Sequence, residues 1–140
     1  MTCTFFGSRY SSGEIRGILK DRIIGLIKKN NVTTFYVGNN GMFDGLVISV
    51  LKEIEQEFSR ISFYVVLAYM PVQRGNFDYD TIYPETLANV PTRFAIKSRN
   101  MWMIEKSDFV ITYATNSVGN AAKFKIIAEK KKKTVIDLLN

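Results

Sequence analysis

The sequence predicts a Rossmann-like α/β domain, a three-layer α/β/α sandwich in which helices cover both faces of a mostly parallel five-stranded sheet. Five short apolar segments alternate with four segments of helical periodicity, and this alternation requires crossover connections that make the strands parallel. The segment 62–69 is a nearly continuous apolar run, which is typical of a strand buried between two helical layers. The length of 140 residues suits one domain, so we assign residues 1–140 to a single domain.

The first half of the chain is expected to contain three strands and two helices. The first helix begins near Ser11 and Glu14, which have capping-box spacing, and it ends at Asn30-Asn31. The second helix is the more clearly amphipathic, because its apolar residues from Phe43 to Phe58 recur every three or four positions. The expected strands are 2–6, 33–37 and 62–69.

The second half begins with an irregular stretch, 70–91, that holds all three prolines. Loops of this length without secondary structure are uncommon in compact domains and tend to be functional. We expect the strand order 3-2-1-4-5, which reverses direction between the first and fourth strands and places a ligand at that switch point. The remaining elements are a helix at about 92–106, a strand at 108–113, a loop at 114–120, a helix at about 121–131 and a strand at 134–138.

Composition excludes several kinds of site. Cys3 is the only cysteine, so neither an intrachain disulfide nor a thiol cluster for zinc can form. We expect Cys3 to be a buried apolar residue rather than a reactive thiol. Histidine is absent, which excludes a Ser-His-Asp triad, a histidine metal site and a histidine base. We expect no metal and no cofactor.

The chain is expected to be cytoplasmic, without membrane contact. No apolar run approaches the roughly 20 residues that a membrane-spanning helix needs. The first residues lack a basic region followed by an apolar stretch, so no secretion signal is visible. The net charge of +6 favours anionic partners but is spread along the chain. Its densest cluster, Lys130 to Lys133, closes a helix whose negative end it complements.

Three turns that connect a strand to a helix are rich in Gly, Ser, Thr or Asn. Such turns leave backbone N–H groups free at the positive end of a helix dipole, where a phosphate can be bound. The alternative is that these residues only form turns and cap helices. Because the three turns share one edge of the predicted sheet, we favour phosphate-type binding. The turns are Gly7-Ser8-Arg9, Gly38-Asn39-Asn40-Gly41 and the stretch of Thr115, Asn116, Ser117, Val118, Gly119 and Asn120.

Other side chains are candidates with structural alternatives. Arginine can contact a phosphate or carboxylate with its forked guanidinium, although each arginine alone also suits a surface charge. Aromatic rings can stack on a base, although most are expected in the core, and only one in a polar loop, Tyr83, is favoured. The arginines considered are Arg9, Arg93 and Arg99, and the aromatic residues are Tyr69, Tyr83, Trp102 and Tyr113.

Two carboxylates are also candidates. Asp44 opens the second helix, where it either caps the helix or contacts a ribose hydroxyl. Glu85 is the loop carboxylate best placed to act as a general acid or base if the protein is an enzyme.

Four spaced motifs resemble the SLOG superfamily, in particular its small, stand-alone bacterial branch. The resemblance runs over nearly the whole chain in the right order. It implies a Rossmann-like fold and kinship with cytokinin-activating phosphoribohydrolases of the LOG type, the DNA-processing protein DprA and sensor domains of bacterial defence systems. Some of those sensors bind ADP-ribose-derived signals. The motifs are Phe5-Phe6-Gly7-Ser8-Arg9, Phe35 through Asp44, Ile82-Tyr83-Pro84-Glu85 and Ser98-Arg99-Asn100 through Met103 to Ser107-Asp108.

The resemblance implies that Gly7, Ser8, Gly38, Asn39, Asp44, Arg99 and the 115–120 loop line the ligand pocket. One departure bears on activity. The LOG-type hydrolases carry Pro-Gly-Gly-x-Gly-Thr followed closely by a Glu that is catalytic together with an upstream Arg. Arg99 matches that Arg, but Phe124 or Lys125 falls in the place of the Glu. A hydrolase that stabilises a cationic ribosyl transition state therefore lacks its carboxylate here.

The leading hypothesis is non-catalytic binding of a nucleotide-derived ligand, such as an ADP-ribose-type or cyclic-nucleotide immune signal, for sensing or sequestration in defence or anti-defence. The first alternative is a nucleotide N-glycosidase that uses Glu85 or a carboxylate from a neighbouring subunit. Nucleic-acid binding ranks last, because basic residues are interspersed with acidic ones and no aromatic–basic stripe is present. We expect a homo-oligomer, because the 70–91 segment is long enough to reach a neighbour's pocket.

Overall fold

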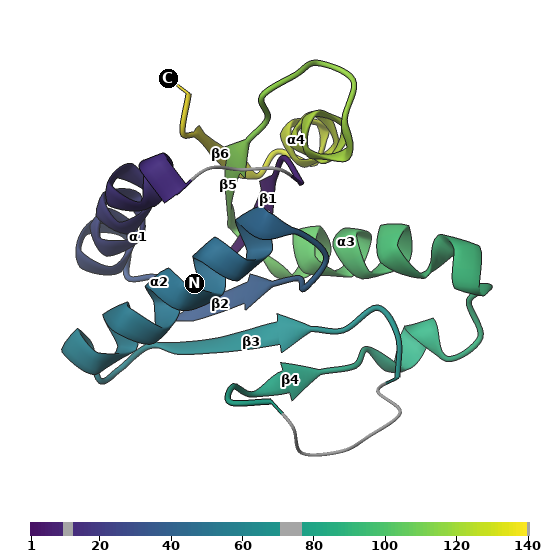
Figure 1. The fold of residues 1–140 in the computed structure, drawn as a ribbon, viewed down its shortest axis with the longest axis horizontal. Coiled ribbons are helices and arrows are strands. Elements are labelled where there is room, and N and C mark those ends of the chain that lie inside the picture. Colours follow the sequence, from purple (N-terminus) through teal and green to yellow (C-terminus); the bar gives the residue numbers. More distant parts are fainter. Residues whose placement is uncertain (10–12, 71–76, 140) are drawn as a thin grey trace.

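The computed structural model describes residues 1–9, 13–70 and 77–139 and confirms the expected α/β fold with a parallel sheet (Figure 1). The sheet has the order β4-β3-β2-β1-β5-β6, and every neighbouring pair is parallel. The strands are β1 (Thr2–Gly7), β2 (Thr34–Val37), β3 (Ser62–Val66), β4 (Thr81–Ile82), β5 (Phe109–Tyr113) and β6 (Thr134–Asp137). The helices are α1 (Arg16–Asn30), α2 (Met42–Glu57), α3 (Ala95–Lys106) and α4 (Asn120–Lys130), with short 3-10 turns η1 (Gly13–Ile15), η2 (Glu85–Leu87) and η3 (Thr92–Phe94).

The expected order of five strands is confirmed, and a sixth strand extends it. β4 lies inside the stretch 70–91, which we expected to be irregular. It has only two residues, and the N–H of Leu67 donates to Ile82 O at 2.7 Å beside it. A two-residue strand has no periodicity that a sequence pattern can reveal. The strand expected over 62–69 ends earlier, at Val66.

The helix boundaries follow the sequence with small differences. α1 ends where Asn30-Asn31 predicted, because Asn31 adopts the left-handed conformation with φ 55° and its N–H bonds back to Leu26 O. The helix is preceded by η1 and has no side-chain cap at Ile15, and the capping residue proposed for it, Ser11, lies outside the described residues. The helix expected from residue 92 begins as the 3-10 turn η3 and becomes α-helical at Ala95.

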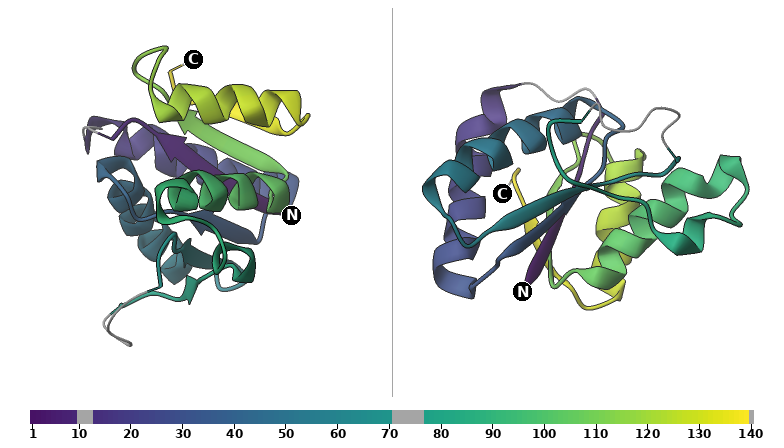
Figure 2. Two further views of the ribbon diagram at one scale, coloured as in Figure 1. Left: turned by 90° about the vertical axis from the view of Figure 1, so that its right-hand side faces the viewer. Right: turned by 90° about the horizontal axis from the view of Figure 1, so that it is seen from below.

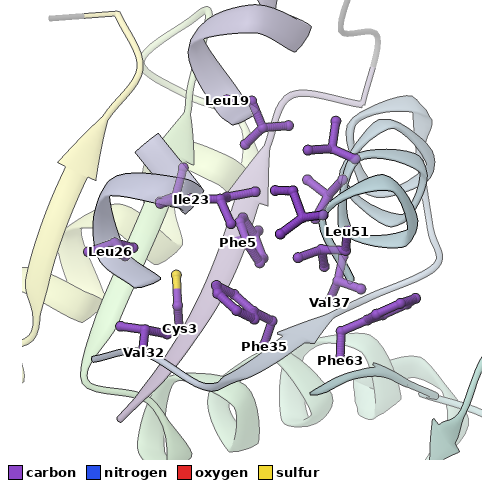
Figure 3. Close-up of a cluster of buried hydrophobic side chains, with 14 of the residues drawn as sticks. Cys3, Phe5, Leu19, Ile23, Leu26, Val32, Phe35, Val37, Leu51 and Phe63 are labelled. Atoms are coloured by element: carbon purple, nitrogen blue, oxygen red, sulfur yellow. The ribbon is translucent and has the colours of Figure 1, made fainter. Parts of the chain in front are cut away.

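Helices cover both faces of the sheet and create two cores. The view from below shows α1 and α2, in purple and blue, on one side of the strands, and α3 and α4, in green and yellow, on the other (Figure 2). Because side chains alternate along a strand, Phe5 packs with α1 and α2, whereas Phe6 packs with α3 and α4. The larger core surrounds Phe5 and Phe35, whose rings stack with centroids 6.1 Å apart (Figure 3).

Cys3 lies in the larger core, fully buried (Figure 3). Burial raises the pKa of its thiol well above the usual range, although a backbone hydrogen bond from Ile111 lowers it. The expectation of a buried apolar cysteine is therefore confirmed. The helices of the described residues are too short or too polar to cross a lipid bilayer.

Candidate functional site

A cavity of about 430 Å³ opens at the carboxyl ends of β1, β2 and β5. This is the switch point, because the chain builds the sheet outward from β1 in one direction and from β5 in the other. The volume falls in the range of small-molecule sites. The structure brings eleven predicted residues together around it: Gly7, Ser8, Arg9, Gly38, Gly41, Asp44, Arg99, Thr115, Asn116, Gly119 and Asn120.

Several candidates do not line the cavity. Asn39 and Ser117 belong to the turns that border the cavity, but both are exposed and do not line it. Tyr83 packs against the larger core, and Glu85 is exposed in η2. The other candidates outside the cavity are Tyr69, Arg93, Trp102 and Tyr113.

Sequence reasoning missed two polar residues and the apolar wall. Asn40 lies in a turn that was singled out, but only its neighbours were selected. Asn100 directly follows Arg99 and faces the same cavity. The apolar lining consists of Phe5, Phe6, Phe43, Ile96, Met103, Ala121 and Phe124, whose helical or strand periodicity is the same as that of core residues.

The turn after β1 is fastened to the turn after β5 through Ser8. The N–H of Ser8 donates to Tyr113 O at 2.8 Å, and its Oγ accepts hydrogen bonds from the N–H and Oγ1 of Thr115 at 2.9 and 2.8 Å. The same turn contacts the start of α2, where the N–H of Met42 donates to Arg9 O at 2.9 Å. Three segments far apart in the sequence are thereby fixed around one opening.

The N-terminal end of α4 faces the cavity with unused donors. Asn116 Oδ1 accepts the N–H groups of Val118 and Gly119 at 3.1 and 2.9 Å and orders the loop. Within the described residues, the N–H groups of Asn120, Ala121 and Ala122 have no hydrogen-bond partner, because the first bond of the helix is made by Lys123. The first turn of α4 therefore has the donors and the dipole that suit an anion.

The expectation that the turns present mostly free amides needs correction. The N–H groups of Asn40, Thr115, Val118 and Gly119 are already bonded to side chains of the site. Short hydroxyl, amide and carboxylate side chains reach nearby amides easily, so the residues that form such turns also occupy their donors. The unused donors named above belong to the helix itself.

Arg99 on α3 is the most buried charged side chain of the site, with 2% of its surface exposed. Its Nε donates to Asn100 Oδ1 at 2.7 Å, its Nη1 to Val66 O at 2.9 Å and its Nη2 to Asn40 Oδ1 at 2.7 Å. Burial lowers the pKa of Arg99 and the charge of Asp44 opposes that shift, but arginine stays protonated in proteins. Arg99 is therefore a fixed cation in the cavity wall.

Gly38 gives the guanidinium its place. A Cβ atom at this position would lie 2.9 Å from Arg99 Cζ and Nη1 and 3.0 Å from Asp44 Oδ2. At these distances a larger residue would displace the guanidinium or the carboxylate, so glycine lets both charged groups approach the end of β2. Gly7 meets a similar demand, since its Cβ would lie 2.1 Å from Cγ of the buried Phe43 ring.

Asp44 is the only carboxylate among the residues that line the cavity. Its Oδ2 accepts the N–H of Asn40 at 2.9 Å, an amide of the turn ahead of α2 rather than of the helix itself. Burial raises the pKa of Asp44, whereas the Asn40 hydrogen bond and the Arg99 charge lower it, and the net shift is upward. The described residues hold no group of three or more acidic or thiol side chains that could bind a metal ion.

The fold and the site together define a Rossmann-like α/β protein with a cavity at its switch point, lined by helix N–H groups, one buried arginine and one carboxylate. No model of a known protein family and no curated protein matches the sequence. The SLOG resemblance therefore stays a prediction.

Proposed function

We propose that this protein binds a nucleotide-derived, anionic small molecule in the switch-point cavity and returns it uncleaved. The observation that carries the proposal is the juxtaposition of the free amides of α4 with the fixed cation Arg99 around a cavity of about 430 Å³. A phosphate suits the amides, and the apolar wall offers a surface for a base or sugar. Binding without turnover suits a sensor or a protein that sequesters its ligand, such as an ADP-ribose-type or cyclic-nucleotide signal.

The absence of hydrolysis is supported by the two residues that stand where LOG-type enzymes carry their Glu. Phe124 is buried and contributes an apolar ring to the cavity, stacked on Phe6 with centroids 5.3 Å apart. Lys125 instead forms an ion pair of 2.6 Å with Asp137 of β6. Neither residue supplies the carboxylate with which LOG-type enzymes stabilise a ribosyl cation.

The test is binding of ADP-ribose and of cyclic ADP-ribose, measured as a shift in Tm and by calorimetry, followed by mass spectrometry of the recovered nucleotide. A ligand present at 100 times its Kd adds about 2.7 kcal/mol to the free energy of unfolding, which is a clear rise in Tm. We expect recovery of intact nucleotide. Failure of both nucleotides to bind, or release of a free base or a ribose phosphate, would refute the proposal.

A matched pair of variants on α4 locates the anion. Asn120→Asp puts a negative charge at the first turn, where it favours the helix but repels a phosphate. Ile126→Asp adds the same charge on the exposed side of the same helix, where half of the isoleucine surface is exposed. We expect weaker binding of ADP-ribose to Asn120→Asp and unchanged binding to Ile126→Asp. Equal effects would show that the charge acts only at long range.

The geometry limits which carboxylate could act if the protein is an N-glycosidase. Glu85 does not line the cavity, so a carboxylate from within this chain would have to be Asp44. If mass spectrometry detects cleavage, Asp44→Asn distinguishes an N-glycosidase from a binding protein, since the amide cannot act as a base or nucleophile. Loss of turnover with retained binding in Asp44→Asn would establish the enzyme.

A further inference from the structure

The cavity holds a second polar feature besides the end of α4, namely the facing pair of Asp44 and Arg99. Asp44 comes from α2 and Arg99 from α3, and both line the cavity. Asp44 Oδ2 and Arg99 Nη1 lie 3.0 and 2.9 Å from the same point, the position of a Cβ on Gly38. The two groups nevertheless form no direct ion pair, although both are described in full. A gap therefore separates a carboxylate from a guanidinium.

Both sides of the gap have hydrogen-bonding capacity left. A guanidinium has five N–H donors, and Arg99 uses three of them on Asn100, Val66 and Asn40. One N–H on Nη1 and one on Nη2 remain. On the other side, Asp44 Oδ2 accepts the N–H of Asn40, and Asp44 Oδ1 has no partner within the described residues. The pair thus keeps donors on Arg99 and an acceptor on Asp44 that no described residue uses.

Asn40 fixes both walls at once. Its side-chain Oδ1 accepts from Arg99 Nη2 at 2.7 Å, and its backbone N–H donates to Asp44 Oδ2 at 2.9 Å. The turn after β2 therefore sets the separation of the two charged groups, and Asn40 acts as a positioning residue for both.

The charges decide which chemical group suits the gap. An anion in the gap would be attracted by Arg99 but repelled by Asp44. A cation would be attracted by Asp44 but repelled by Arg99. A hydroxyl group accepts from the guanidinium and donates to the carboxylate, so it satisfies both walls without adding charge. We infer that this gap binds a sugar hydroxyl and makes the site select ribose-containing nucleotides over their deoxy analogues. The inference rests on the proposed function. In this arrangement the anionic group of the ligand binds at the end of α4, and Arg99 contacts the hydroxyl instead.

The experiment compares ADP-ribose with analogues that lack the 2′-hydroxyl of the adenosine ribose or the 2″-hydroxyl of the terminal ribose, by calorimetry on the full chain. A hydrogen bond to a charged group corresponds to roughly a 10- to 100-fold change in Kd, so we expect one analogue to bind wild-type protein that much more weakly. In Asp44→Asn, which keeps an oxygen for Asn40 but loses the acceptor facing the hydroxyl, the preference should fall to within about twofold. Asp21→Asn is the control, because Asp21 is exposed on α1 away from the cavity.

The outcomes separate the inference from the proposed function. If both analogues bind wild-type protein as tightly as ADP-ribose does, the inferred selection of ribose over deoxyribose is refuted and the proposed function stands. If Asp44→Asn keeps the full preference, the preference arises elsewhere and the inference is wrong. If neither ADP-ribose nor cyclic ADP-ribose binds, both fail, and if only the cyclic nucleotide binds, the comparison is made with its deoxy analogues. The wild-type comparison needs no variant, so the inference stays testable even if Asp44→Asn does not fold.

Discussion

Replacement of Gly38 by alanine tests whether the end of β2 holds the charged groups of the site in place. The new Cβ would lie 2.9 Å from Arg99 Cζ, well inside the usual separation of about 3.5–4.0 Å between carbon atoms. Arg99 must then shift, and its bonds of 2.9 Å to Val66 O and 2.7 Å to Asn40 Oδ1 lengthen with it. Overpacking of this kind costs about 1–3 kcal/mol, so we expect the free energy of unfolding to fall by that amount.

Gly25→Ala is the matched control for this substitution. Gly25 lies inside α1, and a Cβ there meets nothing within 4 Å. Alanine in a helix interior is favoured over glycine by roughly 0.5–1 kcal/mol, so this variant should be more stable than wild-type protein.

Urea denaturation followed by circular dichroism measures both variants, and calorimetry with ADP-ribose reports on the site. We expect Gly38→Ala to lose both stability and binding, because the displaced guanidinium and carboxylate belong to one cavity wall. Unchanged stability and unchanged binding in Gly38→Ala would refute the reasoning that glycine is required at this contact.

Three further predictions concern titratable groups. Burial raises the pKa of Asp44 in the folded protein, so the contribution of this group to the free energy of unfolding is complete below the ordinary pKa and is lost as the pH rises through the folded pKa. Asp44→Asn should therefore gain stability relative to wild-type protein between acid and neutral pH in urea titrations. A loss of stability at neutral pH would contradict this prediction. Burial raises the pKa of Asp137, but the hydrogen bonds from Lys125 and the Leu139 N–H outweigh burial and leave the pKa lowered. The ion pair with Lys125 therefore stabilises the folded protein above the ordinary pKa, and this stabilisation is lost as the pH falls through the folded pKa. Asp137→Asn should lower the free energy of unfolding by up to about 1 kcal/mol at neutral pH and leave it unchanged below the folded pKa. Because the Cys3 thiol is buried and its pKa raised, Ellman's reagent should react with it only in urea, and rapid labelling of native protein would show that the first strand opens.

The sequence by itself was enough to predict the fold. Apolar periodicity marked all four helices and five of the six strands, and the alternation of the two elements imposed parallel pairing and the observed order. It also indicated where the site would be, because turns that follow parallel strands must meet at one edge of the sheet. Nine of the eleven predicted residues that line the cavity belong to these turns, and the other two are Asp44 of α2 and Arg99 of α3.

The tertiary structure alone decided what that edge contains. Whether a turn amide is free or bonded depends on distances between segments, such as the contact of Ser8 with Thr115, that no local pattern encodes. Asn40 became important only because folding places it between Arg99 and Asp44. Periodicity reports which face of an element is buried, whereas the partner of each polar atom is set by long-range packing, so the gap that we assign to a sugar hydroxyl could be seen only in the folded chain.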